Sequence, residues 1–281
     1  MANMEREHNA VNTKRDLMKS IILAVWAYRF FIFSSIKTEF RSRFARSKFG
    51  GLWMVLHPLA LVLIYALILS QIMTAKLPEV TTQYAYPIYI LSGMVGWTLF
   101  SEILGRSLTV FIDNGNLIKK MAFPKLALPL ITIGSALVNF ALLFLMMFIV
   151  FGALGHLPYH ALHWTLLLVV ITVGLAVGLG LFFGVMNVFM RDIGQIMNIV
   201  LQFWFWLTPI VYMMSIVPQK YHWLFMLNPM TGVTMGFQNV LLYDKAPDLG
   251  LLVYPTVFAL VFLLLALVIF KKANEEMADV L

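Results

Sequence analysis

Cysteine is missing from this sequence of 281 residues, and charged side chains are scarce. The missing cysteine excludes disulfide bonds and thiolate metal sites. Charged residues make up 12% of the chain, about half of the roughly 25% that is usual in soluble domains. Hydrophobic residues make up 61%, and they gather in long continuous runs. Such runs are typical of membrane-spanning helices rather than of a membrane β-barrel, so the sequence predicts an all-α integral membrane protein.

Motifs of the common catalytic sites are also missing. The sequence has no G-x-x-x-x-G-K-[ST] phosphate loop, no H-E-x-x-H zinc motif and no G-x-S-x-G nucleophile turn. His156, His160 and His163 share one loop without a carboxylate or fourth ligand beside them, so we expect no metal site. Glu102 is the only acidic residue in the spans predicted below, whereas carriers driven by ion gradients usually need intramembrane acids. We therefore expect no enzyme activity and no cofactor in this chain, and a partner that supplies the energy for any transport.

Six apolar runs are long enough to cross about 30 Å of hydrocarbon. We place these spans at Trp53–Met73, Pro87–Phe111, Leu126–Leu154, Leu162–Phe189, Ile196–Ile216 and Leu251–Phe270. The predicted organisation is a polar tail over 1–19, an amphipathic segment and turn over 20–50, a membrane domain over 51–270 and a tail over 271–281. In the fourth span, the spacing of Gly174 and Gly178 favours close approach of a neighbouring helix.

The distribution of Lys and Arg predicts the orientation of the chain. With six spans, the two termini lie on the same side of the membrane. All but three of the 20 Lys and Arg residues lie on that side, the exceptions being Lys76, Lys220 and Lys245. Because positive residues concentrate on the cytoplasmic side of membrane proteins, we expect both termini in the cytoplasm.

The segment before the first span combines aromatic and basic side chains. Read at the helical period, five aromatic residues share one stripe: Trp26, Phe30, Phe33, Phe40 and Phe44. The apolar part of this segment is too short to cross the membrane and contains Arg29. These features favour a helix that lies along the membrane surface near anionic lipid headgroups and turns into the first span at Gly50-Gly51. A signal anchor or a loosely bound basic tail is the alternative.

The second span contains two ionisable residues, Glu102 and Arg106. Their i,i+4 spacing lets them pair on one face of a helix. A structural ion pair near the cytoplasmic end of the span is the favoured interpretation, because the long Arg side chain reaches the headgroup region from there. A polar patch in a translocation path or at a subunit contact is the alternative.

The fifth span is rich in aromatic residues. They are Phe203, Trp204, Phe205 and Trp206, followed by Tyr212 beyond Thr208-Pro209. Lipid contact and interfacial anchoring explain such residues in many membrane proteins. Aromatic faces also bind the apolar faces of sugars, so these five residues are candidates for channel lining.

Two apolar segments between the fifth and sixth spans are too short to cross the membrane. They are Tyr221–Leu227 and Met230–Leu242, and the turn signal Asn228-Pro229 separates them. We expect two half-helices that enter the membrane from outside, with Tyr221, Trp223, Asn228 and Pro229 as a candidate gate. A merely structural turn is the alternative.

The connection between the second and third spans carries signals for a short helix. Asp113-Asn114-Gly115-Asn116 offers N-cap side chains, and Phe123-Pro124 stops a helix. We therefore expect a short cytoplasmic helix within Asn116–Phe123. An ordinary basic connection is the alternative.

Several short motifs along the chain occur in the order found in one family. They are Arg43–Gly50, Leu52-Trp53, His57-Pro58-Leu59, Asn116–Lys120 with Phe123-Pro124, Arg191-Asp192, Pro209-Ile210 with Tyr212, and Leu227-Asn228-Pro229. In this order the chain resembles the type-2 ABC exporter permeases of the polysaccharide branch, which are the membrane subunits of O-antigen, capsule and teichoic-acid exporters. The resemblance extends from about Lys37 to Phe270 and departs at Phe49-Gly50-Gly51, where a Leu-Gly pair is more usual in the family.

The resemblance implies a homodimer of six-span subunits in the bacterial inner membrane that exports a lipid-linked polysaccharide. It implies two separate ABC ATPase subunits that carry ATP and Mg, and no nucleic-acid partner. The implied ATPase contacts are Asn116, Leu117, Ile118, Lys119, Lys120 and Phe123, with a second contact at Arg191 and Asp192. The segment up to Lys48 would be an interface helix, and Pro218–Leu242 would hold the gate. An exporter of drugs or small lipids with the same fold, or a non-transporting membrane scaffold, is the alternative.

Overall fold

The structure is a computed structural model that describes residues 28–44, 52, 56, 59–60, 64, 84–120, 125–273 and 276–281. These residues contain helices and no strand, as the sequence predicts. The longer helices are α2 (Arg29–Phe44), α4 (Ala85–Asp113), α6 (Ala127–Ala153), α7 (Trp164–Phe189), α8 (Asp192–Trp206), α10 (Pro229–Leu241) and α11 (Leu249–Ala273). The shorter elements are α5 (Gly115–Lys120), the 3₁₀ turns η2 (Met214–Ile216) and η3 (Gln219–Tyr221), α9 (His222–Met226) and α12 (Met277–Val280).

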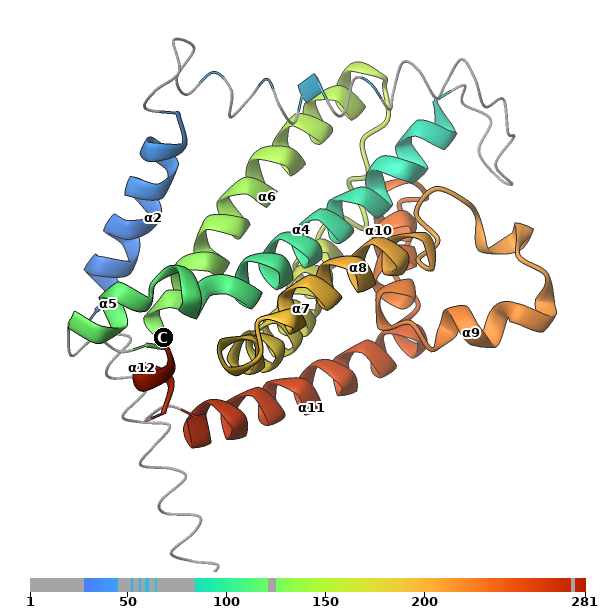
Figure 1. The fold of residues 1–281 in the computed structure, drawn as a ribbon. Helices are drawn as coiled ribbons and strands as arrows, with labels where there is room; N and C mark the ends of the chain where they lie inside the picture. Colours follow the sequence, from blue (N-terminus) through green and yellow to red (C-terminus); the bar gives the residue numbers. More distant parts are fainter. Residues whose placement is uncertain are drawn as a thin grey trace, which may run out of the picture.

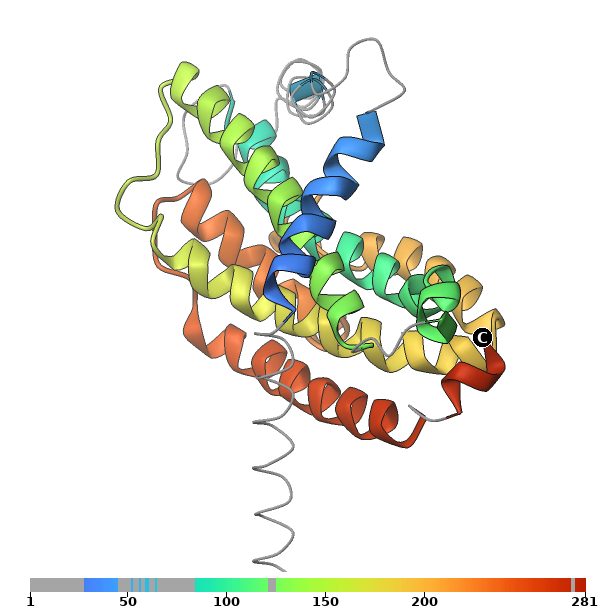
Figure 2. The same cartoon turned by 90° about the vertical axis from the view of Figure 1, so that its left-hand side faces the viewer.

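Helices α4 and α7 form the centre of the described structure. α4 packs against α6 and α7, and α7 packs in turn against α11 (Figures 1 and 2). The apolar stretch of α4 is 72% buried and that of α7 is 50% buried, whereas α6 and α11 bury 17% and 22% of theirs. α6 and α11 are therefore the outer helices of this layer.

Four of the predicted spans are present as helices. By length and composition α4, α6, α7 and α11 are able to cross a membrane, and their ends lie close to the predicted ones. The predicted first span, Trp53–Met73, lies largely outside the described residues, as do the tail 1–19 and the turn at Gly50-Gly51.

Glycines allow α7 to approach both of its neighbours closely. A Cβ atom on Gly178 would lie 2.9 Å from the backbone nitrogen of Leu263 in α11. A Cβ atom on Gly184 would collide with the backbone carbonyl of Ser107 in α4. The close approach predicted from Gly174 and Gly178 is thus confirmed, and Gly184 permits the same approach on the side of α4.

Helix α2 packs against α6 through part of its surface only. Ile36 lies so close to Gly134 that a Cβ atom there would collide with it, and Phe40 is buried. Phe30 and Phe33 are each 73% exposed. Within the predicted aromatic stripe, Phe40 therefore contacts the protein while Phe30 and Phe33 point outward. Trp26 and the Phe44 side chain lie outside the described residues.

The predicted fifth span, Ile196–Ile216, does not form a single helix in the structure. Helix α8 ends at Trp206, and residues 207–213, which we call the break, are irregular. Pro209 explains the end of the helix, because its ring clashes with the preceding turn and its nitrogen has no hydrogen to donate.

The two short helices predicted after the fifth span are present as α9 and α10. The side chain of Asn228 caps α10 by accepting a hydrogen bond from the Met230 N–H (2.8 Å), and Pro229 occupies the first turn. α10 is buried against α4, α7 and α11, whereas α9 projects away from these helices (Figure 1).

Candidate functional site

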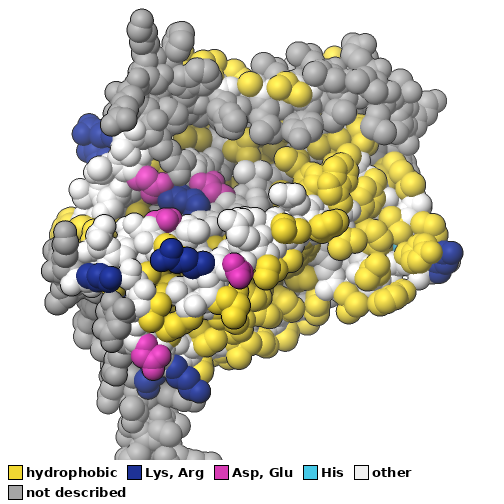
Figure 3. Space-filling view, in the orientation of Figure 1, with side chains coloured by type: hydrophobic (Ala, Val, Ile, Leu, Met, Phe, Trp, Pro, Cys, Tyr) yellow, Lys and Arg dark blue, Asp and Glu magenta, His cyan; other side chains and the backbone are white. Residues whose placement is uncertain are grey.

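Charged side chains gather at one end of the molecule. This end, which we call the α5 end, consists of residues 113–120, 189–194 and 276–281. In Figure 3 most of the Lys, Arg, Asp and Glu side chains lie toward the α5 end, and a wide apolar surface covers the opposite side of the view. The α5 end therefore offers the polar surface on which a water-soluble partner would bind.

Helix α5 forms where the sequence predicts a short helix. Its Asn116 and Lys119 side chains are exposed, Leu117 is half-buried, and Ile118 is buried. The predicted contacts that lie outside the described part of the chain are the Lys120 side chain and Phe123. α5 thus presents polar side chains outward and anchors itself through an apolar one.

The second predicted contact lies at the bend between α7 and α8. Arg191 and Asp192 are both exposed there, and Asp192 occupies the first turn of α8, where a negative charge interacts favourably with the helix dipole. Because α12 packs against both α5 and α7, the structure brings the two predicted contact segments to the same end.

A buried asparagine fixes this bend to α4. The Asn187 side chain donates a hydrogen bond to the Leu108 carbonyl (2.8 Å) and accepts one from the Gly194 N–H (2.8 Å). Its exposure is 2%. Sequence reasoning missed Asn187. A single amide in an apolar span indicates a contact with a neighbouring helix, because such a group needs hydrogen-bond partners in the membrane.

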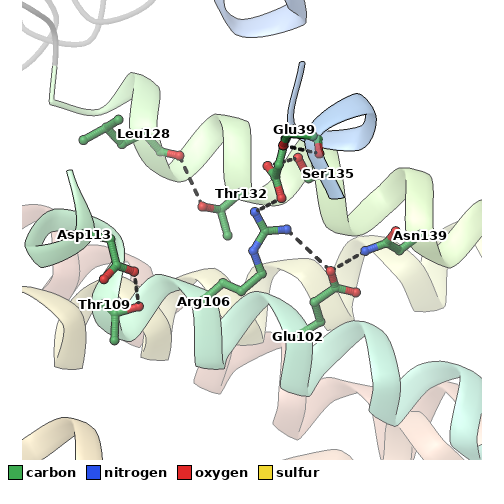
Figure 4. A network of polar contacts seen from close by, with 10 residues as sticks. Glu39, Glu102, Arg106, Thr109, Asp113, Leu128, Thr132, Ser135 and Asn139 are labelled. Carbon is green, nitrogen blue, oxygen red and sulfur yellow. Dashed lines mark hydrogen bonds and ion pairs between the residues drawn. The ribbon is translucent and has the colours of Figure 1, made fainter. Parts of the chain in front are cut away.

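A polar network joins three helices (Figure 4). The predicted pair is present, with Arg106 Nη1 3.5 Å from Glu102 Oε1. A shorter contact joins Arg106 Nη2 to Glu39 Oε1 of α2 (2.6 Å), and Glu39 Oε2 accepts a hydrogen bond from Ser135 Oγ of α6 (2.6 Å). Asn139 of α6 donates to Glu102. The predicted ion pair is thus confirmed, and it belongs to a network that ties α2 to α4 and α6.

Two of the α8 aromatic residues point into the protein. The ring of Trp204 lies 5.2 Å from that of Phe100, and the ring of Phe205 lies 5.6 Å from that of Trp97, both pairs edge to face. These contacts attach α8 to α4. They also occupy the inward sides of both rings, so neither ring is fully open to a passing substrate.

The other two aromatic residues lie on an exposed surface together with side-chain amides. Phe203 is 68% exposed and Trp206 is 63% exposed. Three amides share this side of the helix, and within the described structure their side chains make no hydrogen bond. We call this surface the α8 face and define it as Gln195, Asn198, Ile199, Gln202, Phe203 and Trp206.

Side chains from distant helices bind the backbone carbonyls of the break. The Tyr86 hydroxyl of α4 donates to the Val211 carbonyl (2.7 Å), and Gln238 of α10 donates to the Pro209 carbonyl (2.9 Å). The Tyr89 hydroxyl approaches the same Pro209 carbonyl at 3.3 Å. Irregular backbone at membrane depth needs partners of this kind, so α4 and α10 hold the break in place.

Tyr212, the fifth candidate for channel lining, lies at the end of the break. It is half-buried, and its hydroxyl donates to the Trp206 carbonyl (2.6 Å). Its ring lies 6.0 Å from that of Phe225 in α9. Tyr212 therefore bridges the end of α8 and the projecting helix α9.

Asn228 joins the end of α8 to the start of α10. Its Oδ1 accepts a hydrogen bond from the indole N–H of Trp204 (2.6 Å). Its Nδ2 donates to Thr208 Oγ1 (2.8 Å) and to the Leu207 carbonyl (3.1 Å). The predicted turn residue is thus bound directly to the aromatic helix that precedes it.

The remaining candidate gate residues divide between buried and exposed positions. Pro229 is buried at the start of α10, while Tyr221 and Trp223 are exposed beside and on α9. Lys220 lies over the Tyr221 ring at 4.7 Å. The exposed part of the candidate gate therefore consists mainly of aromatic side chains.

Two loops meet at the opposite end, between α6 and α7 and between α10 and α11. His160 Nδ1 lies 2.7 Å from Asp244 Oδ2, and the Ala161 N–H donates to Asp244 Oδ1 (2.8 Å). Burial by itself raises the pKa of Asp244, but hydrogen bonds from Ala161 and His160 outweigh it, so the pKa lies below its usual value. Among the described residues, no group of three or more His, Cys, Asp or Glu side chains is placed to hold a metal ion.

Comparison with known proteins gives consistent matches along the chain. The family described as ABC-2 type transporter matches residues 31–242. The O-antigen export system permease protein RfbA of Myxococcus xanthus is 28% identical over 266 residues, which cover 93% of this chain and 99% of that protein. An O-antigen export permease RfbA of Klebsiella pneumoniae is 26% identical over 251 residues, or 86% and 92% of the two chains. The polysialic acid transport protein KpsM of Escherichia coli is 26% identical over 246 residues, or 85% and 92%.

Proposed function

Because the chain belongs to the ABC-2 type transporter family, we propose that it is the membrane permease of an ATP-driven exporter of a lipid-linked polysaccharide. Its relatives named as O-antigen and polysialic acid permeases match it over most of both chains, which supports a glycan substrate. The permease works as a homodimer in the bacterial inner membrane, and two ABC ATPase subunits bind the ATP and Mg. Each copy has six spans with cytoplasmic termini, and α8 lies in the fifth.

The ATPase contacts lie at the α5 end. Exposed Asn116 and Lys119 on α5, and exposed Arg191 and Asp192 at the bend, offer polar and charged side chains to a water-soluble partner. Asn187 connects this bend to the helix that leads into α5. Movement of the ATPase against α5 or against the bend is therefore transmitted to the membrane helices α4, α7 and α8.

The α8 face lines the proposed translocation path, and its amides and exposed rings are the main support for the proposed function. A polar group without partners in hydrocarbon costs several kcal/mol, so Gln195, Asn198 and Gln202 are poorly suited to lipid. A wet path along the dimer supplies these partners. The exposed rings of Phe203 and Trp206 offer the flat apolar surfaces that bind sugars while tolerating different hydroxyl patterns.

The gate lies beyond the break. The exposed Tyr221 and Trp223 project beside the path on a segment that joins the core through Asn228. This segment moves or yields when a glycan chain passes, while α10 stays fixed between its three neighbours.

Export from proteoliposomes tests the assignment of the path. The permease is reconstituted with its ATPase and a lipid-linked polysaccharide, and Trp206→Ala is compared with Leu260→Ala on the exposed side of α11. One aromatic contact contributes about 0.5–1.5 kcal/mol, and 1.36 kcal/mol corresponds to a tenfold change in rate, so Trp206→Ala should slow export about two- to tenfold. Leu260→Ala should leave the rate unchanged.

Two outcomes would count against this function. Equal export rates for the two variants, at equal amounts of inserted protein, would place the path elsewhere. Transport of a small amphipathic compound in place of the polysaccharide by the unaltered protein would favour a drug or lipid exporter.

A further inference from the structure

The segment after α11 returns to the α5 end and packs there. Met277, the first residue of α12, is 0% exposed, and Leu281 packs against the core. α12 contacts both α5 and α7, as its position beside α5 in Figure 1 illustrates. The sequence predicts only a cytoplasmic tail over 271–281, so this packing is new information from the structure.

Helix α5 needs neighbours to hold its position. It has six residues, whereas isolated helices shorter than about 12–15 residues are marginal in water. One residue, Asn114, separates it from α4. Asn114 is hydrogen-bonded to both helices, because its side chain donates to the Val110 carbonyl and its own carbonyl accepts from the Leu117 and Ile118 N–H groups. α5 is thus held on the side of α4, and a second element has to support it from another side.

The α12 segment supplies this second support. A Cβ atom built on Gly115 of α5 would lie 3.6 Å from Leu281 Cβ and 3.8 Å from Leu281 Cδ2, which is ordinary van der Waals contact. Met277 anchors the same segment in the apolar core near α7. Asn116 and Lys119 stay exposed, so the support leaves the outward surface of α5 open.

We propose that α12 and Leu281 brace α5 against α7, so that α5 and the α7–α8 bend meet the ATPase as one rigid surface. The proposal rests on the proposed function, in which α5 contacts the ATPase. Met277 and Leu281 are positioning residues, because they act through α5 and do not touch the partner. The brace stays closed throughout the transport cycle.

A disulfide bond tests the contact directly, because the native chain has no cysteine. Gly115→Cys with Leu281→Cys places two Cβ atoms about 3.6 Å apart, within the range of about 3.5–4.5 Å found in disulfides. Oxidation of the intact transporter in membranes with copper phenanthroline should cross-link this pair. The control pair, Tyr159→Cys with Leu281→Cys, should not cross-link, because Tyr159 lies in the loop between α6 and α7 at the other end.

Export by the cross-linked protein then tests whether the brace stays closed. The oxidised and reduced forms of the same double variant are compared in the presence of the ATPase. Equal export rates are expected. Absence of the cross-link, or a large loss of export that reduction restores, would overturn the proposal.

Met277 variants test the positioning role. If α5 holds its place for only part of the time, the apparent dissociation constant of the ATPase rises by the reciprocal of that fraction. Met277→Ala should therefore raise the ATPase concentration for half-maximal export by roughly three- to tenfold, with the maximal rate nearly unchanged. Met277→Leu should restore the original value, and Val280→Ala, at an exposed position on the same helix, should have no effect.

Lys119→Glu separates failure of the brace from failure of the proposed function. If Lys119→Glu weakens ATPase binding but Met277→Ala does not, the brace is wrong while the contact at α5 stands. If neither variant changes the half-maximal ATPase concentration, α5 is not the contact, and both proposals fail.

Discussion

The exposed sides of α8 and α11 carry different kinds of side chain. On α11 the exposed residues are mostly aliphatic, with Val257, Leu260 and Leu264 as examples. The α8 face instead mixes the amides Gln195 and Gln202 with aromatic rings. Lipid tails suit an aliphatic surface, but they offer no hydrogen-bond partner to an amide. The exposed surfaces of the two helices therefore require different environments. We propose that lipid covers the exposed side of α11 and that water or a second copy covers the α8 face.

A lysine placed on each helix gives the largest expected contrast. Lysine at the lipid-facing centre of a span costs about 2.5–3.5 kcal/mol. Leu264→Lys, at a side chain that is 64% exposed, should therefore sharply reduce membrane insertion. Ile199→Lys in the middle of the α8 face should insert nearly normally, because water or polar partners are available there.

Insertion efficiency, measured by glycosylation mapping of the nearest loop, checks this contrast. Leu264→Met serves as the neutral control for the position. Equal losses for the two lysine variants would mean that lipid covers both helices, and the translocation path would have to be sought elsewhere.

The second contrast concerns how each helix is held to the turn before α10. Asn228 makes several hydrogen bonds to the α8 side of this turn and caps α10. Tyr254 of α11 contributes one hydrogen bond, to the Leu227 carbonyl (2.8 Å). Loss of an N-cap costs about 0.5–2 kcal/mol. Leaving the half-buried Trp204 indole N–H without its acceptor adds to this cost, up to the roughly 1–3 kcal/mol of a fully buried donor. Asn228→Ala should therefore lower thermal stability more than Tyr254→Phe, which removes about 1 kcal/mol.

Thermal unfolding of the purified protein in detergent measures both variants. Asn228→Asp retains the acceptor for the indole and for the Met230 N–H, so it should recover part of the loss. If Asn228→Ala and Tyr254→Phe lower the midpoint equally, the joint between α8 and α10 is not held by Asn228.

The same contrast explains which parts of the fold were predictable. α11 follows from the length of its apolar run alone, and so do α4, α6 and α7, because a span needs no distant partner to form. The end of α8 has a local signal in Pro209, but the contacts that hold the break come from across the fold. The Tyr86 hydroxyl that binds the Val211 carbonyl comes from a residue 125 positions away, and no local periodicity indicates it.

The candidate site was predictable to a similar degree. The motifs located α5 and the α7–α8 bend, because the turn and capping residues that define them are local. The i,i+4 spacing of Glu102 and Arg106 predicted their pairing, but the closest partner of Arg106 is Glu39, 67 positions earlier in the chain. Contacts of this range, including those of Asn187 and α12, come from tertiary packing and leave little trace in a single sequence.

The smallest expected effect is a difference in how two variants, one beside each helix, change stability with pH. The turn that ends α8 is held by the neutral amide of Asn228, whereas the loop before α11 is held by ionisable Asp244. Because the folded protein lowers the pKa of Asp244 below its usual 3.8, this carboxylate stabilises the fold above that value and loses its contribution as the pH falls through the lower, folded pKa. Asp244→Asn should thus reduce stability at pH 7 by less than about 1 kcal/mol, as is usual for exposed pairs, and its deficit should shrink as the pH falls below 3.8 toward the lower, folded pKa. Asn also tolerates the left-handed backbone at this position, where φ is 51°.

The stability deficit of Asn228→Ala should be the same at pH 7 and at pH 3. Thermal unfolding of the two variants at these two pH values checks the difference. A pH-independent deficit for Asp244→Asn would show that the ionised carboxylate does not hold the loop.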